Sequence, residues 1–141
     1  MSDHVFQNYR EQMIKEFHEA FDAAIQEEPT IELVNLRRKL IEEEATELIL
    51  ALDNIAACLE QGIEIKKEDW IETLDGMADL QVVLSGTCVA LKPLFNFHKA
   101  FLRVHESNMS KLGADGKPIL RDDGKVLKGP NYKPPVLEDL V

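Results

Sequence analysis

Two long helical patterns carry acidic residues inside stripes that should be apolar, and this limits how the chain can fold. The stripe of the first pattern, followed at steps of three and four residues, reads Leu36, Leu40, Glu44, Glu47 and Ala51. The stripe of the second pattern reads Ile71, Asp75, Ala78 and Val82. Carboxylates that face one another repel, and each is costly to bury. The two helices therefore need a cation between their carboxylates if these stripes face each other.

Four helical patterns account for the first 110 residues, and short connections join them. They cover residues 5–26, 31–59, 68–91 and 94–111. Local stop signals follow each of them, namely Glu28-Pro29, Gln61-Gly62, Lys92-Pro93 and Gly113. Four amphipathic helices with short connections predict an all-α fold, a four-helix bundle.

The composition changes after the fourth pattern. Residues 111–133 hold six basic and three acidic residues, a local balance of +3 in a chain whose net charge is −10. Within this tail, Asp122-Asp123-Gly124 lies between two short apolar runs and predicts a hairpin. We expect one domain, in which residues 1–112 form the bundle with its acidic site and residues 113–141 form a basic hairpin or extended tail.

The charge and the apolar runs exclude several classes of function. A net charge of −10 argues against binding to nucleic acids or anionic membranes, which requires a basic face. The longest apolar run, residues 80–91, is too short and too polar to span a membrane. No secretory signal is visible, and Cys58 and Cys88 match no zinc spacing. We expect a cytoplasmic protein with reduced thiols.

The acidic residues themselves predict a divalent metal site. Carboxylate oxygens suit Mg²⁺ or Mn²⁺, and Mg²⁺ commonly bridges protein carboxylates to substrate phosphates. Two alternatives remain open: the acids lie on a solvated face, or they form ion pairs with Arg37, Arg38 or Lys39. A di-iron site requires a glutamate three residues before a histidine. No glutamate precedes His18, His98 or His105 at that spacing.

Glu43-Glu44-x-x-Glu47 followed by Glu72-x-x-Asp75 resembles the signature of the all-α nucleoside triphosphate pyrophosphohydrolases. This superfamily includes MazG, phosphoribosyl-ATP pyrophosphohydrolase and the dimeric dUTPases. Two later segments extend the resemblance over nearly the whole chain, Val104-His105-x-Ser107-Asn108-Met109-Ser110-Lys111 and Gly124-Lys125-Val-Leu-Lys128-Gly-Pro130. In MazG the signature aspartate precedes an apolar run, a context that belongs here to Asp79, so Asp75 and Asp79 are both carried over.

The resemblance implies a Mg²⁺-dependent enzyme that cleaves between the α and β phosphates of a nucleoside triphosphate. It also implies a homodimer or a dimer of dimers, with active sites completed across subunits. We expect metal ligation by Glu44, Glu47, Glu72 and Asp75. Glu43 and Asp79 are expected to bind a second ion or to orient the attacking water as general base, and with Glu47 they are the candidate catalytic residues.

Five residues near the end of the chain are candidates for substrate binding. Asn108 and Lys111 are expected to contact phosphate or sugar. Lys125 and Lys128 are expected to hold the triphosphate, and Tyr132 to stack on the base. The alternatives are a lysine that caps a helix C-terminus, a solubilising basic hairpin, and a tyrosine that only packs the tail.

The sequence favours nucleotide-pool house-cleaning on canonical or modified (d)NTPs. Specificity for dUTP or dCTP is a close rival. Hydrolysis of phosphoribosyl-ATP is less favoured, because the long lysine-bearing tail departs from that shorter enzyme. A non-catalytic helical module that binds nucleotide is the alternative from another class, although a purely structural protein could have kept its stripes apolar.

Overall fold

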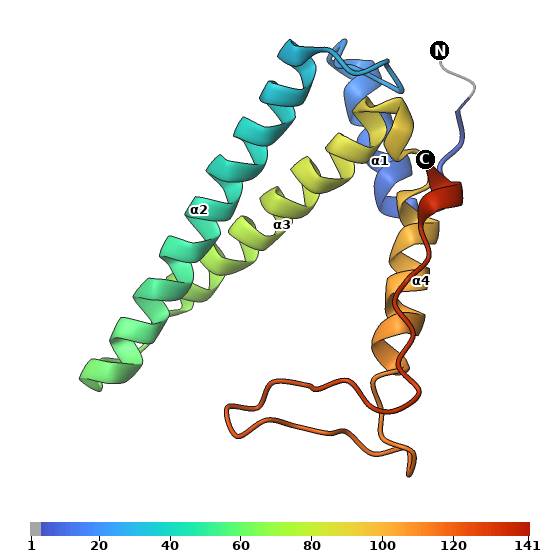
Figure 1. The fold of residues 1–141 in the computed structure, drawn as a ribbon. Coiled ribbons are helices and arrows are strands. Elements are labelled where there is room, and N and C mark those ends of the chain that lie inside the picture. The colour runs from blue at the N-terminus through green and yellow to red at the C-terminus, as the bar shows by residue number, and fades with distance from the viewer. Residues whose placement is uncertain (1–3) are drawn as a thin grey trace. The chain divides into compact units, whose positions relative to one another are not determined.

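The structure is a computed structural model that describes residues 4–141, and helices are its main regular elements, followed by a long non-helical tail (Figure 1). Its four α-helices are joined by turns, loops and one 3-10 helix, a second 3-10 helix lies near the C-terminal end, and no β-strand occurs among these residues. The all-α prediction is confirmed. No helix of the described chain is long and apolar enough to cross a membrane. The chain divides into two compact units, residues 1–92 and 93–141. The fourth helix therefore groups with the tail, whereas the sequence had placed it with the first three helices.

The first unit begins with α1, Tyr9–Ala20. The side chain of Asn8 accepts a hydrogen bond from the backbone N–H of Arg10 and so caps the helix. The predicted helix over residues 5–26 is too long at both ends. Asp22 and Gln26 have positive φ angles of 54° and 50°, which turn the chain out of the helix before the next element.

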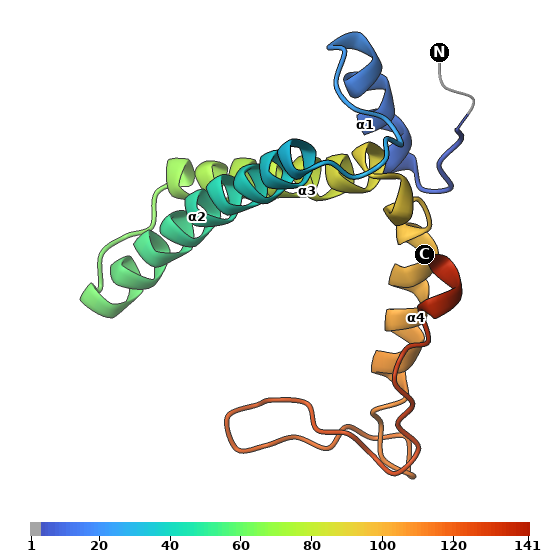
Figure 2. The same ribbon diagram turned by 45° about the horizontal axis from the view of Figure 1, so that its top comes forward.

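The two long helices α2, Ile31–Gln61, and α3, Lys67–Ala90, form an antiparallel pair. Thr30 Oγ1 accepts from the backbone N–H of Leu33 and starts α2, and Gly62 ends it with a φ of 64°. Figures 1 and 2 both show α2 and α3 side by side along most of their length. Asn54 Nδ2 donates to Asp69 Oδ1 at 3.0 Å near the loop that joins the two helices.

The core of the first unit lies at the C-terminal end of α3. Val89 and Ala90 there have no exposed surface. α1 packs against this helix. The link between α1 and α2 runs beside the same residues, where Gln26 Nε2 donates to Cys88 O at 2.9 Å. Farther along α2 and α3, many large apolar side chains are exposed, including Leu36 and Ile71, which the stripes had placed inward. One facing helix covers only part of a broad apolar surface.

The second unit consists of α4, Phe97–Met109, and the tail that returns along it, with short 3-10 helices η1, Lys92–Leu94, at the start and η2, Glu138–Leu140, at the end. Three side chains on α4 or its N-cap hold the tail backbone. Asn96 Nδ2 donates to Leu140 O at 2.9 Å, Arg103 Nη1 to Val136 O at 2.9 Å, and Ser107 Oγ to Lys133 O at 2.8 Å. Arg103 also forms an ion pair with Asp139.

The hairpin predicted around Asp122-Asp123-Gly124 is present as a short turn. Leu120 and Val126 form an isolated antiparallel bridge, and Gly124 takes a φ of 85°. The base of this loop is closed where Gly129 N donates to Lys111 O at 2.8 Å. A Cβ on Gly129 would lie 2.2 Å from the carbonyl oxygen of Leu112, so only glycine fits there.

Candidate metal centre

The antiparallel pairing of α2 and α3 brings three carboxylates together in the first unit. Glu44 and Glu47 lie on α2, three residues apart and thus on one face of the helix. Asp79 faces them from α3. One oxygen from each of the three carboxylates lies within 4.8 Å of the others, a spacing at which one cation could contact all three. We call Glu44, Glu47 and Asp79 the acidic triad.

The innermost member of the triad is Glu44. Its Oε2 atom is buried and has no hydrogen-bond partner among the described residues. Burial raises the pKa of this carboxyl, and the negative charges of Glu47, Asp79, Glu43 and Asp75 raise the pKa further, in that order. A buried acceptor without a donor is costly, and these neighbours supply only more acceptors. A divalent cation between the carboxylates would satisfy that oxygen and offset the repulsion, so the residues present fit a Mg²⁺ or Mn²⁺ ion.

The three basic residues just before the acidic motif do not pair with the triad. Arg38 pairs with Glu42 at 3.1 Å, and Lys39 with Glu43 at 3.9 Å. Arg37 turns inward and donates to backbone and hydroxyl oxygens of α3. Within residues 4–141, the ion pairs foreseen as the alternative to metal thus involve only Glu42 and Glu43.

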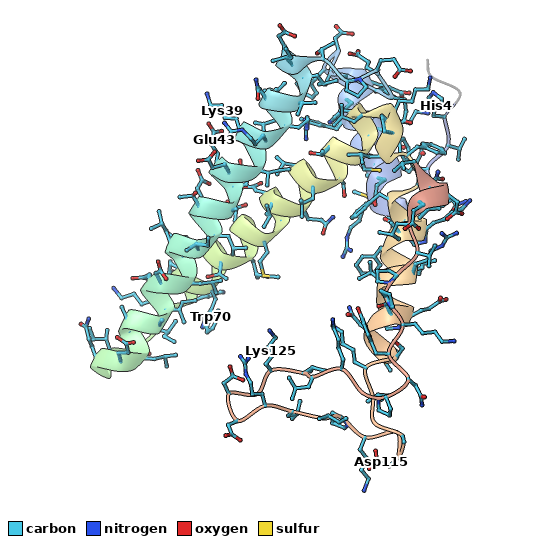
Figure 3. The ribbon with its side chains drawn as sticks, in the orientation of Figure 1. His4, Lys39, Glu43, Trp70, Asp115 and Lys125 are labelled. Carbon is cyan, nitrogen blue, oxygen red and sulfur yellow. The ribbon has the colours of Figure 1, made fainter. Side chains whose placement is uncertain are left out.

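The triad differs in part from the expected ligand set. Asp79, foreseen for a second ion or as a base, takes the place opposite Glu44. Asp75 is exposed, although its charge is close enough to raise the pKa of Glu44. Glu72 is exposed and lies outside the triad. Glu43 lies with Lys39 on the side of α2 that points away from α3 (Figure 3). The catalytic roles of Glu43, Glu47 and Asp79 stay predictions.

A groove of about 420 Å³ lies between α1 and α3. Its lining is mostly apolar, with Met13, Leu74 and Met77 among its side chains, and Arg10 and Gln81 contribute polar groups. Ala78, the neighbour of Asp79, also lines it. Sequence reasoning missed this groove because two helices build it, although Gln81 inside an apolar run was a local signal.

The candidate substrate-binding residues all lie in the second unit. Asn108 is exposed at the end of α4, and Lys111 follows it at the base of the loop that Gly129 closes. Lys125 is exposed near the tip of the hairpin (Figure 3). Lys128 Nζ lies 4.6 Å from the centre of the Tyr132 ring, a cation–π contact that holds both side chains together.

The model of one protein family matches residues 14–108, and that family is described as phosphoribosyl-ATP pyrophosphohydrolase. The match takes in the whole acidic triad, α2 and α3. It ends before residues 111–129, which we call the basic loop, and before the rest of the tail. No curated protein matches the chain.

Proposed function

Because the chain belongs to the phosphoribosyl-ATP pyrophosphohydrolase family, we propose that it is a Mg²⁺-dependent nucleoside triphosphate pyrophosphohydrolase. The family itself identifies a pyrophosphohydrolase that acts on a nucleotide-like substrate. The proposal adds cleavage of (d)NTPs between the α and β phosphates to (d)NMP and pyrophosphate. It also adds Mg²⁺ as the metal, with Mn²⁺ as a substitute, and nucleotide-pool house-cleaning in the cytoplasm as the role.

One observation carries the proposal: Glu44 presents a buried, unpartnered carboxylate oxygen to two further carboxylates. An arrangement of this kind destabilises a protein that binds nothing there. Bound Mg²⁺ would neutralise charge on the phosphates and lower the pKa of a water molecule. Glu44 and Asp79 would hold the ion. Glu47, whose side chain is more exposed, would also accept the proton of the attacking water.

The basic loop supports a triphosphate as substrate. Lys111, Lys125 and Lys128 supply cations in a chain that is otherwise strongly acidic, and Tyr132 offers a ring beside Lys128. The groove between α1 and α3 provides apolar surface for a nucleoside. These residues of the loop lie beyond the family match, which ends at residue 108. We therefore favour (d)NTPs over phosphoribosyl-ATP, with dUTP or dCTP specificity as the alternative within this class.

We further propose that a second copy of the chain completes the enzyme. Tyr9, Phe17 and Phe21 of the α1 region are exposed, with 80%, 48% and 71% of their surface accessible. Leu50 of α2 and Leu74 of α3 are 62% and 67% exposed. Apolar residues exposed in such number mark a contact surface. A homodimer or a dimer of dimers would cover them and would allow one subunit to complete the site of another.

The test is an assay of pyrophosphate release from a panel of NTPs, dNTPs and phosphoribosyl-ATP with Mg²⁺. We expect (d)NMP and pyrophosphate as products, and a loss of activity of about 10²-fold or more in Glu47→Ala. Glu42→Ala is the matched control, because Glu42 belongs to the same acidic run but pairs with Arg38 on the exposed side.

Different outcomes would overturn different parts of the proposal. No turnover of any nucleotide would favour the non-catalytic nucleotide-binding module. Turnover that Glu47→Ala leaves intact would remove the triad from the reaction. Release of phosphate instead of pyrophosphate would place the cleavage at another bond.

A further inference from the structure

Contacts between α2 and α3 follow one register on both sides of the acidic triad. Arg37 of α2 lies against Gly86 of α3. Glu44, seven residues after Arg37, lies against Asp79, seven residues before Gly86. Asn54, farther along α2, bonds to Asp69, which precedes Asp79 by the same number of residues as separate Glu44 from Asn54. The triad thus lies between fixed points of a regular antiparallel pair.

The first fixed point is the buried Arg37, which is 7% exposed. Its Nη2 donates to Val83 O at 2.9 Å and its Nε to Thr87 Oγ1 at 3.2 Å, both on α3. Val83 lies one turn beyond Asp79 on the same helix. A rigid guanidinium that reaches two successive points of the facing helix fixes both the rotation and the axial position of α2 against α3.

Two glycines of α3 allow the helices to approach closely at either side of the triad. A Cβ on Gly86 would lie 2.4 Å from Nη2 of Arg37 and 3.1 Å from Nε2 of His18, so the guanidinium, with the imidazole beside it, occupies the space that a side chain would fill. A Cβ on Gly76 would lie 3.3 Å from the Cα atom of Leu48 on α2. Leu48 directly follows Glu47. The helix backbones therefore approach each other closely next to the ligands themselves.

From these contacts we infer that Arg37, Gly86 and Gly76 are positioning residues, which set the spacing and register of α2 and α3 so that the acidic triad shares one cation. This inference rests on the proposed metal site. None of the three residues belongs to the triad, and Arg37 forms no ion pair with it among the described residues. Their effect on the metal is transmitted through the distance between two helices.

The test is a titration of the metal-free protein with Mn²⁺, with free Mn²⁺ followed by electron paramagnetic resonance, and with thermal unfolding measured on the same samples. We expect Gly86→Ala and Gly76→Ala to raise the Kd for Mn²⁺ by about tenfold or more, the range found when residues that orient metal ligands are changed. Val89→Ala is the matched control for stability, because Val89 is a fully buried residue of α3 whose backbone bonds to Gln26. It should lower Tm and leave the Kd within about twofold of wild type.

A double variant separates positioning from general loss of packing. If Gly86 serves to make room for Arg37, Arg37→Met combined with Gly86→Ala should bind Mn²⁺ no more weakly than Arg37→Met alone. Should Gly86→Ala fail to fold, Thr87→Val puts a methyl group in place of the hydroxyl that accepts from Arg37 and donates to Val83 O, and it should weaken Mn²⁺ binding in the same direction.

Failure of this inference differs from failure of the proposed function. Glycine variants that lose stability as Val89→Ala does, yet bind Mn²⁺ with the wild-type Kd, would overturn the inference and leave the enzyme intact. A wild-type protein that binds Mn²⁺ but releases no pyrophosphate from any nucleotide would overturn the proposed function. The inference would still be decided by comparing the Kd for Mn²⁺ of the variants with that of the wild type. A wild-type protein that binds no Mn²⁺ would overturn both.

Discussion

Glu44 illustrates how a single residue can oppose stability for the sake of binding. Its carboxylate is buried without a donor and faces like charges, which raise its pKa. Glu44→Gln removes the charge and adds a donor while keeping the shape. In the metal-free protein we expect this substitution to raise Tm by about 2 °C or more. We also expect the variant to lose Mn²⁺ binding. Unfolding followed by circular dichroism in the presence of a chelator measures the first effect. A lower Tm would show that Glu44 is already satisfied without metal.

His18 gives the first unit a pH-dependent stability. Burial lowers the pKa of its ring, its hydrogen bond to Ala24 O partly restores it, and the charge of Arg37 lowers it again. Between the two pKa values, His18 is protonated in the unfolded chain and neutral in the folded chain. The contribution of His18 is fully present above pH 6.5, the ordinary value, and is lost as the pH falls through the lowered pKa.

We expect His18→Gln to flatten this dependence. For one proton, the free energy of unfolding of the wild type should fall by at most about 1.4 kcal/mol per pH unit more steeply than that of the variant. Urea unfolding between pH 7.5 and 5 measures both slopes. Parallel slopes would mean that His18 is protonated in the folded protein as well.

Among the elements, the loop closed by Gly129 presents the basic residues of the second unit. Gly129→Ala would push a methyl group against the carbonyl of Leu112 and open the base of the loop. We expect KM for the nucleotide to rise about tenfold and the Kd for Mn²⁺ to stay unchanged. Gly116→Asn is the control, since its Cβ would meet open space and asparagine tolerates a φ of 75°. Equal KM values for the two variants would show that the loop does not take part in substrate binding.

The elements also show where sequence reasoning succeeds. The predicted helix over residues 31–59, with its stop signal at Gln61-Gly62, agrees closely with α2, because a cap and a left-handed glycine act within one turn. The end of α1 was missed because the chain turns at Asp22, which has a φ of 54°, and the segment after it brings Gln26 to Cys88, 62 residues away. No local pattern reveals such a contact.

The acidic site was predictable to the level of its two helices. The sequence pointed to α2 and α3 because charged residues interrupt their apolar stripes. Which aspartate faces Glu44 depends on how the two helices are rotated, and a difference of one turn separates Asp75 from Asp79. That rotation follows from Arg37 and the glycines of α3, whose role no spacing of acids discloses.

For the whole molecule, the exposed apolar side chains predict self-association. Sedimentation at micromolar concentration should show a dimer or a dimer of dimers. Leu50→Glu should shift the protein toward a monomer, because a charge within an apolar contact must be desolvated on association. Gln61→Glu, at the end of α2, is the matched charge control. A wild-type monomer at these concentrations would refute the proposed assembly.

The matched register of α2 and α3 also restricts how the gene can change in length. One codon inserted between Arg37 and Glu44 would turn the following part of α2 by about 100° and carry Glu44 and Glu47 away from Asp79. Between Asn54 and Asp69 no such penalty applies, because shortening the end of α2 and the start of α3 equally leaves the register of the remaining residues unchanged. Relatives of this protein should therefore differ in length at residues 55–68 and keep a constant count from Arg37 to Asn54.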